Sequence, residues 1–370
     1  MSNPKQKPIN VLHVSSPLSW RGGEQQLYYL HSGLKDRGYN SAVFCPNESI
    51  LASRLTIDER VLYNKRSGFD IGAAYSLAKF CRMHKTNIIH AHDAHAHTTA
   101  VLSSLFFGNK VPIFLSRRVD FEIGKSWFSR FKYNYKQIKV IACVSDLIRS
   151  MVEPKIHAEH VKVLTIHSGV DLTRFENVTP INLREELHVD KNEKLVANFS
   201  ALADHKDYFT FLKTAKEVCK NRNDVTFLIF GKGELEEELK NYSNTLGITD
   251  KVIFAGFRKD LPSVYPNIDV LLFTSKTEGL GTTILDAFAS KTPVVATRAG
   301  GIPEMVIHNQ TGLLAEVGDA NSLAEHVELM LDNRDFANTI RSQALLKAQE
   351  FTVSSMIDKT ENSYKKVLNI

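Results

Sequence analysis

The sequence predicts an α/β protein made of two tandem, doubly wound Rossmann-like domains. Short β-rich runs alternate with amphipathic helical stretches along nearly the whole chain. The β-rich runs are apolar almost throughout, which is typical of parallel strands that helices cover on both faces. The chain has 370 residues, enough for two domains that each bury a core of their own.

In the first half, one clear helical stretch is 23–38, where Leu27, Leu30 and Leu34 recur on one face. Residues 172–193 then interrupt the alternation, because they are polar and contain a proline, and we interpret them as a linker. The strands predicted before this segment are 9–15, 41–45, 87–92, 112–116, 140–145 and 161–166.

The alternation restarts after the linker and ends in a helical tail from about residue 320. The second set of predicted strands is 194–200, 225–231, 251–256, 269–275 and 293–297. We therefore expect domains at 1–176 and 177–349, followed by a last helix at 350–370. Ligands of such sheets bind at the C-terminal ends of the strands, so two facing domains would share one cleft.

Composition is that of an ordinary globular protein, with 43% hydrophobic and 24% charged residues. No stretch approaches the roughly 20 apolar residues of a bilayer span, and the first residues lack the apolar core of a signal peptide. The four cysteines are scattered and form no C-x-x-C pair. These features predict a reduced, cytoplasmic protein.

Charge is unevenly distributed along the chain. Residues 1–180 hold 24 Lys and Arg against 14 Asp and Glu, a net of +10, whereas the remaining 22 basic and 27 acidic residues give −5. A basic first half suits an anionic partner such as a phosphorylated ligand, a membrane surface or a nucleic acid. A solvated surface with no partner fits these counts equally well.

Residues 125–139 interleave five cations with five aromatic side chains. Such mixing occurs in nucleic-acid sites and at membrane interfaces. The alternative, which the pattern favours somewhat, is an amphipathic helix with buried aromatics and solvated cations. Arg117 and Arg118, after the strand at 112–116, are candidates for the same anion-binding role.

The stretch TEGLGTTILDAFASKTPVVATRAGGIPE, residues 277–304, carries the most specific chemistry. Glu278 follows a predicted strand, a glycine turn over Gly279, Leu280, Gly281 and Thr282 leads into a helix, and Asp286 lies about one turn inside it. Helix N-termini bind phosphates, and glycine lets backbone amides approach them. A nucleoside diphosphate sugar matches this order, with its sugar at Glu278, its diphosphate at the turn and its ribose at Asp286. Two solvated acids around a capped helix are the alternative.

This stretch resembles the E-x7-E region of the retaining GT-B glycosyltransferases of family 4. Further segments agree with that family in order along the chain, at 21–39, 88–92, 144–148, 166–175, 201–215, 230–239 and 311–319. The resemblance implies a GT-B fold whose last helix crosses back to the first domain. It also implies metal-independent transfer of a sugar, with retention, from a UDP-sugar or GDP-sugar to a saccharide or lipid-linked acceptor, in polysaccharide or lipid-linked glycan assembly. No cofactor and no nucleic acid are expected, and the basic first domain is a candidate for peripheral contact with the inner face of the membrane.

The resemblance also assigns roles to single residues. Lys206 matches the family lysine that neutralises the diphosphate leaving group, and Glu278 matches the residue that orients the sugar. His92 matches the histidine near the donor sugar. Gly22 and Gly23 match a glycine turn after the first strand, where the donor approaches the backbone.

Phe257 and Arg258 match the place where the nucleotide base usually rests. Two positions depart from the family pattern. Ser200 or Ala201 occurs where the family usually has an arginine, so Lys206 would face the diphosphate with less help. The second acid is Asp286 rather than glutamate, which is one methylene shorter but keeps both acceptor oxygens.

Three other functions fit parts of the sequence. A nucleotide-sugar epimerase shares the fold, and the missing arginine is consistent with a protein that binds a sugar nucleotide without turnover. The segment HAHDAHAH, residues 90–97, also has metal-ligating side chains, but its spacing is not that of metal hydrolases. We expect His92 to contact the donor, His90 to be packed or to support it, and His95 and His97 to be exposed.

Overall fold

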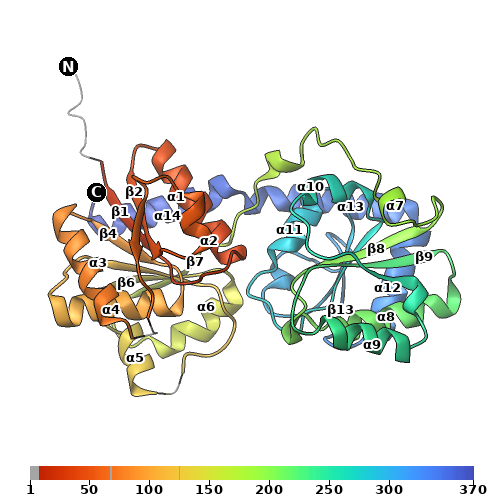
Figure 1. Cartoon of the computed structure of the whole chain (residues 1–370), viewed down its shortest axis with the longest axis horizontal. Coiled ribbons are helices and arrows are strands. Elements are labelled where there is room, and N and C mark those ends of the chain that lie inside the picture. Colours follow the sequence, from red (N-terminus) through yellow and green to blue (C-terminus); the bar gives the residue numbers. More distant parts are fainter. Residues whose placement is uncertain (1–7, 67–68, 125) are drawn as a thin grey trace. The chain divides into compact units, whose positions relative to one another are not determined.

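The computed structural model describes residues 8–66, 69–124 and 126–370, which form two compact units (Figure 1). The N-terminal unit comprises the described residues up to Gly169 together with Val353–Ile370, and the C-terminal unit comprises Val170–Thr352. Each unit is built on one sheet in which every strand pair is parallel. The predicted fold class, two Rossmann-like domains, is confirmed.

The N-terminal unit has a seven-stranded sheet in the order β3-β2-β1-β4-β5-β6-β7. The strand order reverses between β1 and β4, so this is the switch point where such sheets bind ligands. The edge strand β3 was not predicted from the sequence. The strands are β1 (Asn10–Val14), β2 (Asn40–Pro46), β3 (Arg60–Tyr63), β4 (Ile88–Ala91), β5 (Ile113–Arg117), β6 (Ile138–Cys143) and β7 (Lys162–Thr165).

The last helix of the chain, α14 (Val353–Leu368), packs within the N-terminal unit against α1 (Figure 1). A Cβ on Gly33 would lie 2.2 Å from Cδ1 of Ile357, so glycine makes room for this helix. Arg37 forms ion pairs with Asp358 at 2.6 Å and Glu361 at 2.7 Å. The other helices of this unit are α1 (Gly22–Asp36), α2 (Ile50–Arg54), α3 (Ile71–Met83), α4 (Ala94–Phe107), α5 (Trp127–Tyr133), α6 (Asp146–Val152) and the 3₁₀ turn η1 (Glu153–Lys155).

The C-terminal unit has a six-stranded sheet in the order β10-β9-β8-β11-β12-β13, with its switch point between β8 and β11. Its core includes Val196, Phe211, Phe227 and Ile340, all fully buried. The strands are β8 (Lys194–Phe199), β9 (Val225–Phe230), β10 (Val252–Phe254), β11 (Val270–Phe273), β12 (Val294–Thr297) and β13 (Leu313–Ala315), the last of which was not predicted.

The segment that we interpreted as a linker belongs largely to the C-terminal unit. It contains the 3₁₀ turn η2 (Leu172–Phe175) and α7 (Leu183–Glu186), and Leu183 is fully buried. The remaining helices are α8 (Tyr208–Asn221), α9 (Glu236–Thr245), α10 (Leu261–Val264), α11 (Thr282–Ala289), α12 (Ala320–Asp332) and α13 (Arg334–Ala348), with 3₁₀ turns η3 (Asp204–Lys206), η4 (Thr249–Lys251), η5 (Tyr265–Asn267), η6 (Ile302–Glu304) and η7 (Gln349–Phe351). In the described part of the chain, no helix is both long enough and apolar enough to cross a membrane.

Candidate functional site

An ion pair between Lys206 and Glu278 lies at the switch point of the C-terminal sheet. Lys206 ends η3 in the loop after β8, and Glu278 lies in the loop after β11. The two side chains are only 15% and 16% exposed, and Ser275 Oγ lies 3.4 Å from the Glu278 carboxylate. The Lys206 ammonium also lies 5.2 Å from the centre of the Phe273 ring. A cation and an anion are therefore held together where ligands of this fold bind.

Backbone contacts fix the loops that carry this pair. Thr274 Oγ1 lies within hydrogen-bonding distance of the carbonyl oxygens of Lys206 (3.2 Å) and Asp207 (3.0 Å). Gly301 N donates to Glu278 O at 2.9 Å. Gly300 has a φ of +53°, and a Cβ there would lie 1.8 Å from Glu278 O, so this position requires glycine. The Gly-Gly of the GGIPE motif thus positions Glu278.

The helix α11 begins immediately after the glycine turn. Gly281 precedes it with a φ of +93°, and no side chain caps the helix among the described residues. Leu280 buries its side chain, so only its backbone is available to a ligand. Free amides and the positive end of the helix dipole make this N-terminus suitable for phosphate.

Asp286 lies in the second turn of α11, close to Tyr265 and Arg174. Burial raises the pKa of its carboxyl from 3.8 to about 7, although the Arg174 charge opposes this shift. Tyr265 Oη donates to the Thr283 carbonyl at 3.2 Å. Arg174 belongs to η2, so the segment expected as a linker supplies a cation whose charge acts on the second acid. Near neutral pH, this carboxyl can therefore gain or lose a proton.

Ser200, one of the two residues expected where the family usually has an arginine, is engaged within its own unit. Its hydroxyl lies 3.0 Å from both Asn198 Oδ1 and Tyr208 Oη. The loop Gly231–Gly233 crosses close by, because a Cβ on Gly231 would lie 1.9 Å from Ser200 O. That loop carries the exposed Lys232, whose carbonyl accepts from Leu202 N at 3.2 Å. The sequence analysis did not single out Lys232, a cation whose backbone lies beside this loop.

The predicted base-contact residues follow β10. Phe257 is 63% exposed. Arg258 forms ion pairs with Glu186 and with Asp260, the latter at 2.6 Å. The charge of Arg258 is therefore compensated within the C-terminal unit.

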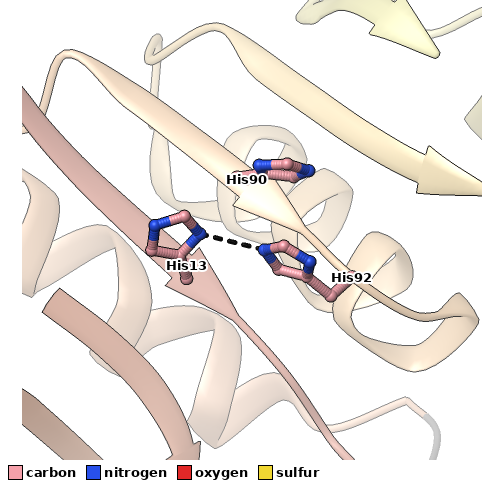
Figure 2. Close-up of side chains that lie close together, drawn as sticks. All are labelled: His13, His90 and His92. Atoms are coloured by element: carbon pink, nitrogen blue, oxygen red, sulfur yellow. Dashed lines mark hydrogen bonds between the residues drawn. The ribbon is translucent and has the colours of Figure 1, made fainter. Parts of the chain in front are cut away.

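Three buried histidines meet at the switch point of the N-terminal sheet. Figure 2 shows His13 from β1, His90 from β4 and His92 just after β4. His13 Nδ1 and His92 Nε2 lie 2.9 Å apart in a hydrogen bond. His90 contacts Tyr364 Oη of α14 at 2.5 Å through Nδ1 and Ser116 Oγ at 2.8 Å through Nε2. Burial lowers the pKa of all three imidazoles well below 6.5, so they are neutral at physiological pH.

The geometry of this cluster does not favour a metal ion, although its nitrogens lie within 4.8 Å of one another. Both nitrogens of His90 are already engaged by Tyr364 and Ser116. The rings of His90 and His92 stack, with centroids 4.0 Å apart and planes 25° apart.

Arg118 lies beside His92. Arg118 Nη2 lies 3.4 Å from His92 Nδ1. Burial lowers the pKa of Arg118 to about 10, against the opposing effect of Glu24. Gly22 and Gly23 are the first two residues of α1 rather than a turn before it, and a Cβ on Gly23 would lie 3.7 Å from Arg118 Cδ.

Several expectations about neighbouring residues need correction. His97 is fully buried rather than exposed, and its Nε2 lies 3.0 Å from the Lys132 carbonyl. His95 is exposed, as predicted. Arg117 is buried and donates to Tyr133 Oη at 2.9 Å, so of the two arginines only Arg118 reaches the histidines.

His13 is a member of the cluster that sequence reasoning missed. The available signal was a histidine near the end of the first predicted strand. The strand register brings His13 into the cluster, because His13 on β1 pairs directly with His90 on β4.

Comparisons with known families match both units. The family model "Glycosyltransferase Family 4" matches residues 20–174, and "Glycosyl transferases group 1" matches residues 181–346. N-acetyl-alpha-D-glucosaminyl L-malate synthase of Bacillus anthracis is 24% identical over 365 residues, covering 96% of this chain and 92% of that protein. A UDP-Gal:alpha-D-GlcNAc-diphosphoundecaprenol alpha-1,3-galactosyltransferase of Escherichia coli is 24% identical over 306 residues, covering 80% and 79%.

Solved structures show the same fold. A glycosyltransferase from Rickettsia africae superposes with a TM-score of 0.85 at 22% identity, covering 98% of this chain and 99% of that one. Anabaena HepE, in complex with UDP and glucose, superposes with a TM-score of 0.82 at 20% identity, covering 97% and 100%. With two family models that together match most of its length and a GT-B fold in both units, this chain belongs to the family 4 group of GT-B glycosyltransferases.

Proposed function

We propose that this enzyme transfers a sugar, with retention and without a metal ion, from a nucleoside diphosphate sugar to a saccharide or lipid-linked acceptor. The observation that carries the proposal is the Lys206–Glu278 pair beside the open N-terminus of α11. The relatives support a uridine donor, because one is named for UDP-galactose transfer and HepE was solved with UDP and glucose. The E. coli relative also names a lipid-linked acceptor.

Each part of the donor has a partner in the C-terminal unit. The diphosphate would bind the amides of Gly281 and Thr282, with Lys206 turning from Glu278 towards the phosphate. The ribose hydroxyls would donate to Asp286, and the sugar hydroxyls to Glu278. Fixed donors and dipoles of this kind stabilise charge that develops in a transition state without reorganising during the reaction.

The reaction balances without a further co-reactant. The bond between the anomeric carbon and the diphosphate oxygen breaks, and the oxygen keeps the electron pair. The acceptor oxygen then bonds to the same face of the anomeric carbon, while its proton passes to the departing diphosphate. Lys206 and the helix dipole supply the positive charge that a divalent cation would otherwise contribute. Glu278 would orient the sugar and stabilise positive charge at the anomeric carbon.

Lys206→Ala is the variant that tests this assignment. It should lower kcat/KM by the equivalent of about 2–4 kcal/mol, as loss of other preorganised donors does. The matched control is Lys276→Ala, because Lys276 lies in the same loop as Glu278 but pairs with the exposed Asp204. Wild-type turnover by Lys206→Ala would overturn the role of Lys206.

A thermal-shift screen with UDP-, GDP-, ADP- and dTDP-sugars in EDTA identifies the donor. A ligand at about 100 times its Kd stabilises by roughly 2.7 kcal/mol, so one nucleotide class should stand out. Loss of the shift in EDTA would contradict metal independence. Isomerisation of the donor with no acceptor present would instead indicate an epimerase. Binding of a sugar nucleotide without turnover on any acceptor would indicate a sensor. A sensor is the second candidate function because Ser200 or Ala201 occurs where the family usually has an arginine.

A further inference from the structure

A polar cavity of about 280 Å³ lies in the C-terminal unit, away from the candidate donor site. Its walls come from α7, the segment before β11, the end of α11, and α13. The helices α11 and α13 pack against each other (Figure 1). The charged residues of the lining are Arg184, Asp269, Lys291 and Arg341.

The cavity lies at the edge of the sheet opposite the candidate donor site. Asp269 directly precedes β11, and Thr292 comes shortly before β12. Lys206 and Glu278, in contrast, follow the C-terminal ends of β8 and β11. Because all strands of this sheet are parallel, a ligand in the cavity would not occupy the donor site.

The acid of this lining is already engaged on both oxygens. Asp269 Oδ2 accepts a hydrogen bond from Leu195 N at 2.9 Å and lies 3.4 Å from Arg184 Nη2. Asp269 Oδ1 lies 3.4 Å from Lys194 Nζ. Three cations against one acid give the described lining a net charge of +2, and Asp269 has no free oxygen for the remaining cations.

Both arginines of the cavity have unused binding capacity. Arg341 donates from Nη1 to Asn338 Oδ1 at 2.8 Å but forms no ion pair with any residue that the structure describes. Burial lowers the pKa of Arg341 below 12.5; the Asp269 charge opposes this shift, and the Arg334 charge adds to it. Arg184 Nε is buried and has no hydrogen-bond partner among the described residues. An anion in the cavity would supply what both guanidinium groups lack.

Lys291 occurs in a backbone conformation that glycine usually provides. Its φ is +58°, directly after Ser290, the C-cap of α11. Lys291 N donates to Phe288 O at 3.1 Å and Thr292 N donates to Ala287 O at 2.8 Å, the two bonds of a helix end that favours glycine at this position. The lysine therefore strains the backbone, and it adds an exposed cation to the cavity wall.

We propose that this cavity binds a small phosphate monoester at a site separate from the donor site. A phosphate monoester carries about −1.5 to −2 charges near neutral pH, which matches the net charge of the lining. Guanidinium groups bind phosphate oxygens through paired N–H bonds. The dipole of α11 accounts for a cation at Lys291 but not for Arg184 and Arg341. The proposal does not depend on the proposed function.

Titration of the full chain with glycerol 3-phosphate, followed by ³¹P NMR at constant ionic strength, tests the proposal. Arg341→Gln should weaken binding about tenfold or more, because a hydrogen bond to a charged group contributes at least that factor. Arg341→Lys should weaken it less, since it keeps the charge but loses the paired N–H groups. The matched control is Lys213→Gln, an exposed cation on α8 that does not line the cavity and should bind like the wild type.

Lys291→Gly separates loss of the cation from loss of the fold. It should weaken binding about two- to fivefold, because an exposed cation contributes less than a buried one. Its midpoint of thermal unfolding should be at least that of the wild type, since glycine suits the left-handed conformation. Unchanged binding by both Lys291→Gly and Arg341→Gln would exclude this cavity.

Lys206→Ala distinguishes the cavity from the donor site, which could also attract phosphate. This variant should bind glycerol 3-phosphate like the wild type. Binding that is lost in Lys206→Ala and kept in Arg341→Gln would overturn the proposal and assign the phosphate to the donor site. No binding at about 10 mM, or tighter binding of succinate, would also overturn it. Thermal shifts with UDP-sugars report on the donor separately, so failure of the proposed function would appear there and not in this titration.

Discussion

Replacing Asp286 with asparagine should stabilise the protein at alkaline pH while impairing donor binding. The folded pKa of this carboxyl is raised from 3.8 to about 7 by burial. Between those values the folded state holds a proton that the unfolded state has lost, so this group makes stability fall as pH rises through the window. Above pH 7 the full penalty of the buried carboxylate is present. The asparagine of the variant carries no such penalty because its amide does not ionise.

The magnitude follows from the shift. About three pKa units correspond to roughly 4 kcal/mol for a fully buried group. The Asp286 side chain retains some exposure to water, which screens the charge and lowers that figure. The free energy of unfolding of Asp286→Asn, relative to that of the wild type, should therefore rise by roughly 2 kcal/mol between pH 5 and pH 8.

Differential scanning calorimetry at both pH values measures this gain. The control is Asp319→Asn in the same unit, because hydrogen bonds from Ser322 lower the pKa of Asp319. At pH 8, Asp319→Asn should be no more stable than the wild type. A pH-independent difference between Asp286→Asn and the wild type would refute the desolvation argument.

Donor binding should also change the protonation of Asp286. Ribose hydroxyls that donate to the carboxylate favour its ionised form, so binding of a UDP-sugar near pH 7 should release about half a proton. Isothermal titration calorimetry in buffers of different ionisation enthalpy measures that release. Asp286→Asn should abolish it and weaken binding. Proton release that persists in the variant would assign the titration to another group.

Two predictions concern the N-terminal unit. Burial lowers the pKa values of His13, His90 and His92 well below 6.5 and that of His97 to about 3, so below pH 6.5 the unfolded state binds protons first. The free energy of unfolding should then fall as the pH drops from 6.5, by about 1.4 kcal/mol per pH unit for each of these histidines, until its folded pKa is reached. A midpoint of thermal unfolding that stays constant from pH 7 to pH 5 would contradict this. Tyr364→Phe leaves His90 Nδ1 without its partner and should destabilise the protein by about 1–3 kcal/mol in urea titrations, with UDP-sugar binding retained. Unchanged stability would show that the bond contributes nothing.

Hydrophobic periodicity predicted the long, buried strands and the two-domain fold. It missed β3 and β13, and both are short edge strands. Arg60–Tyr63 is half-exposed, and Leu313–Ala315 has only three residues, so neither presents a long apolar run. Residues 172–193 were interpreted as a linker because short polar helices show no hydrophobic periodicity. They belong to the C-terminal unit, in which Leu183 is fully buried.

The candidate donor site of the C-terminal unit and the histidine cluster of the N-terminal unit differ in how far the sequence reveals them. Glu278, the glycine turn and Asp286 lie within nine consecutive residues, so a local pattern can suggest a candidate site, to which the resemblance then adds specificity. The histidine cluster draws on β1, β4 and α14, and the bond between His90 and Tyr364 spans 274 positions. No local pattern encodes such a contact, because it depends on sheet order and on the packing of the last helix.

If Lys206 binds the diphosphate as we propose, its pairing with Glu278 bears on the absence of the family arginine. In the structure, the Lys206 ammonium faces the Glu278 carboxylate, and Ser200, which directly follows β8, is neutral, with its hydroxyl 3.0 Å from Asn198 Oδ1 and from Tyr208 Oη. An arginine that reached this pair would add a second cation beside side chains that are only 15% and 16% exposed, and an uncompensated charge is costly away from water. Under the proposed function, the diphosphate would therefore meet one cationic side chain fewer, and more of the donor's binding free energy would come from the amides of α11.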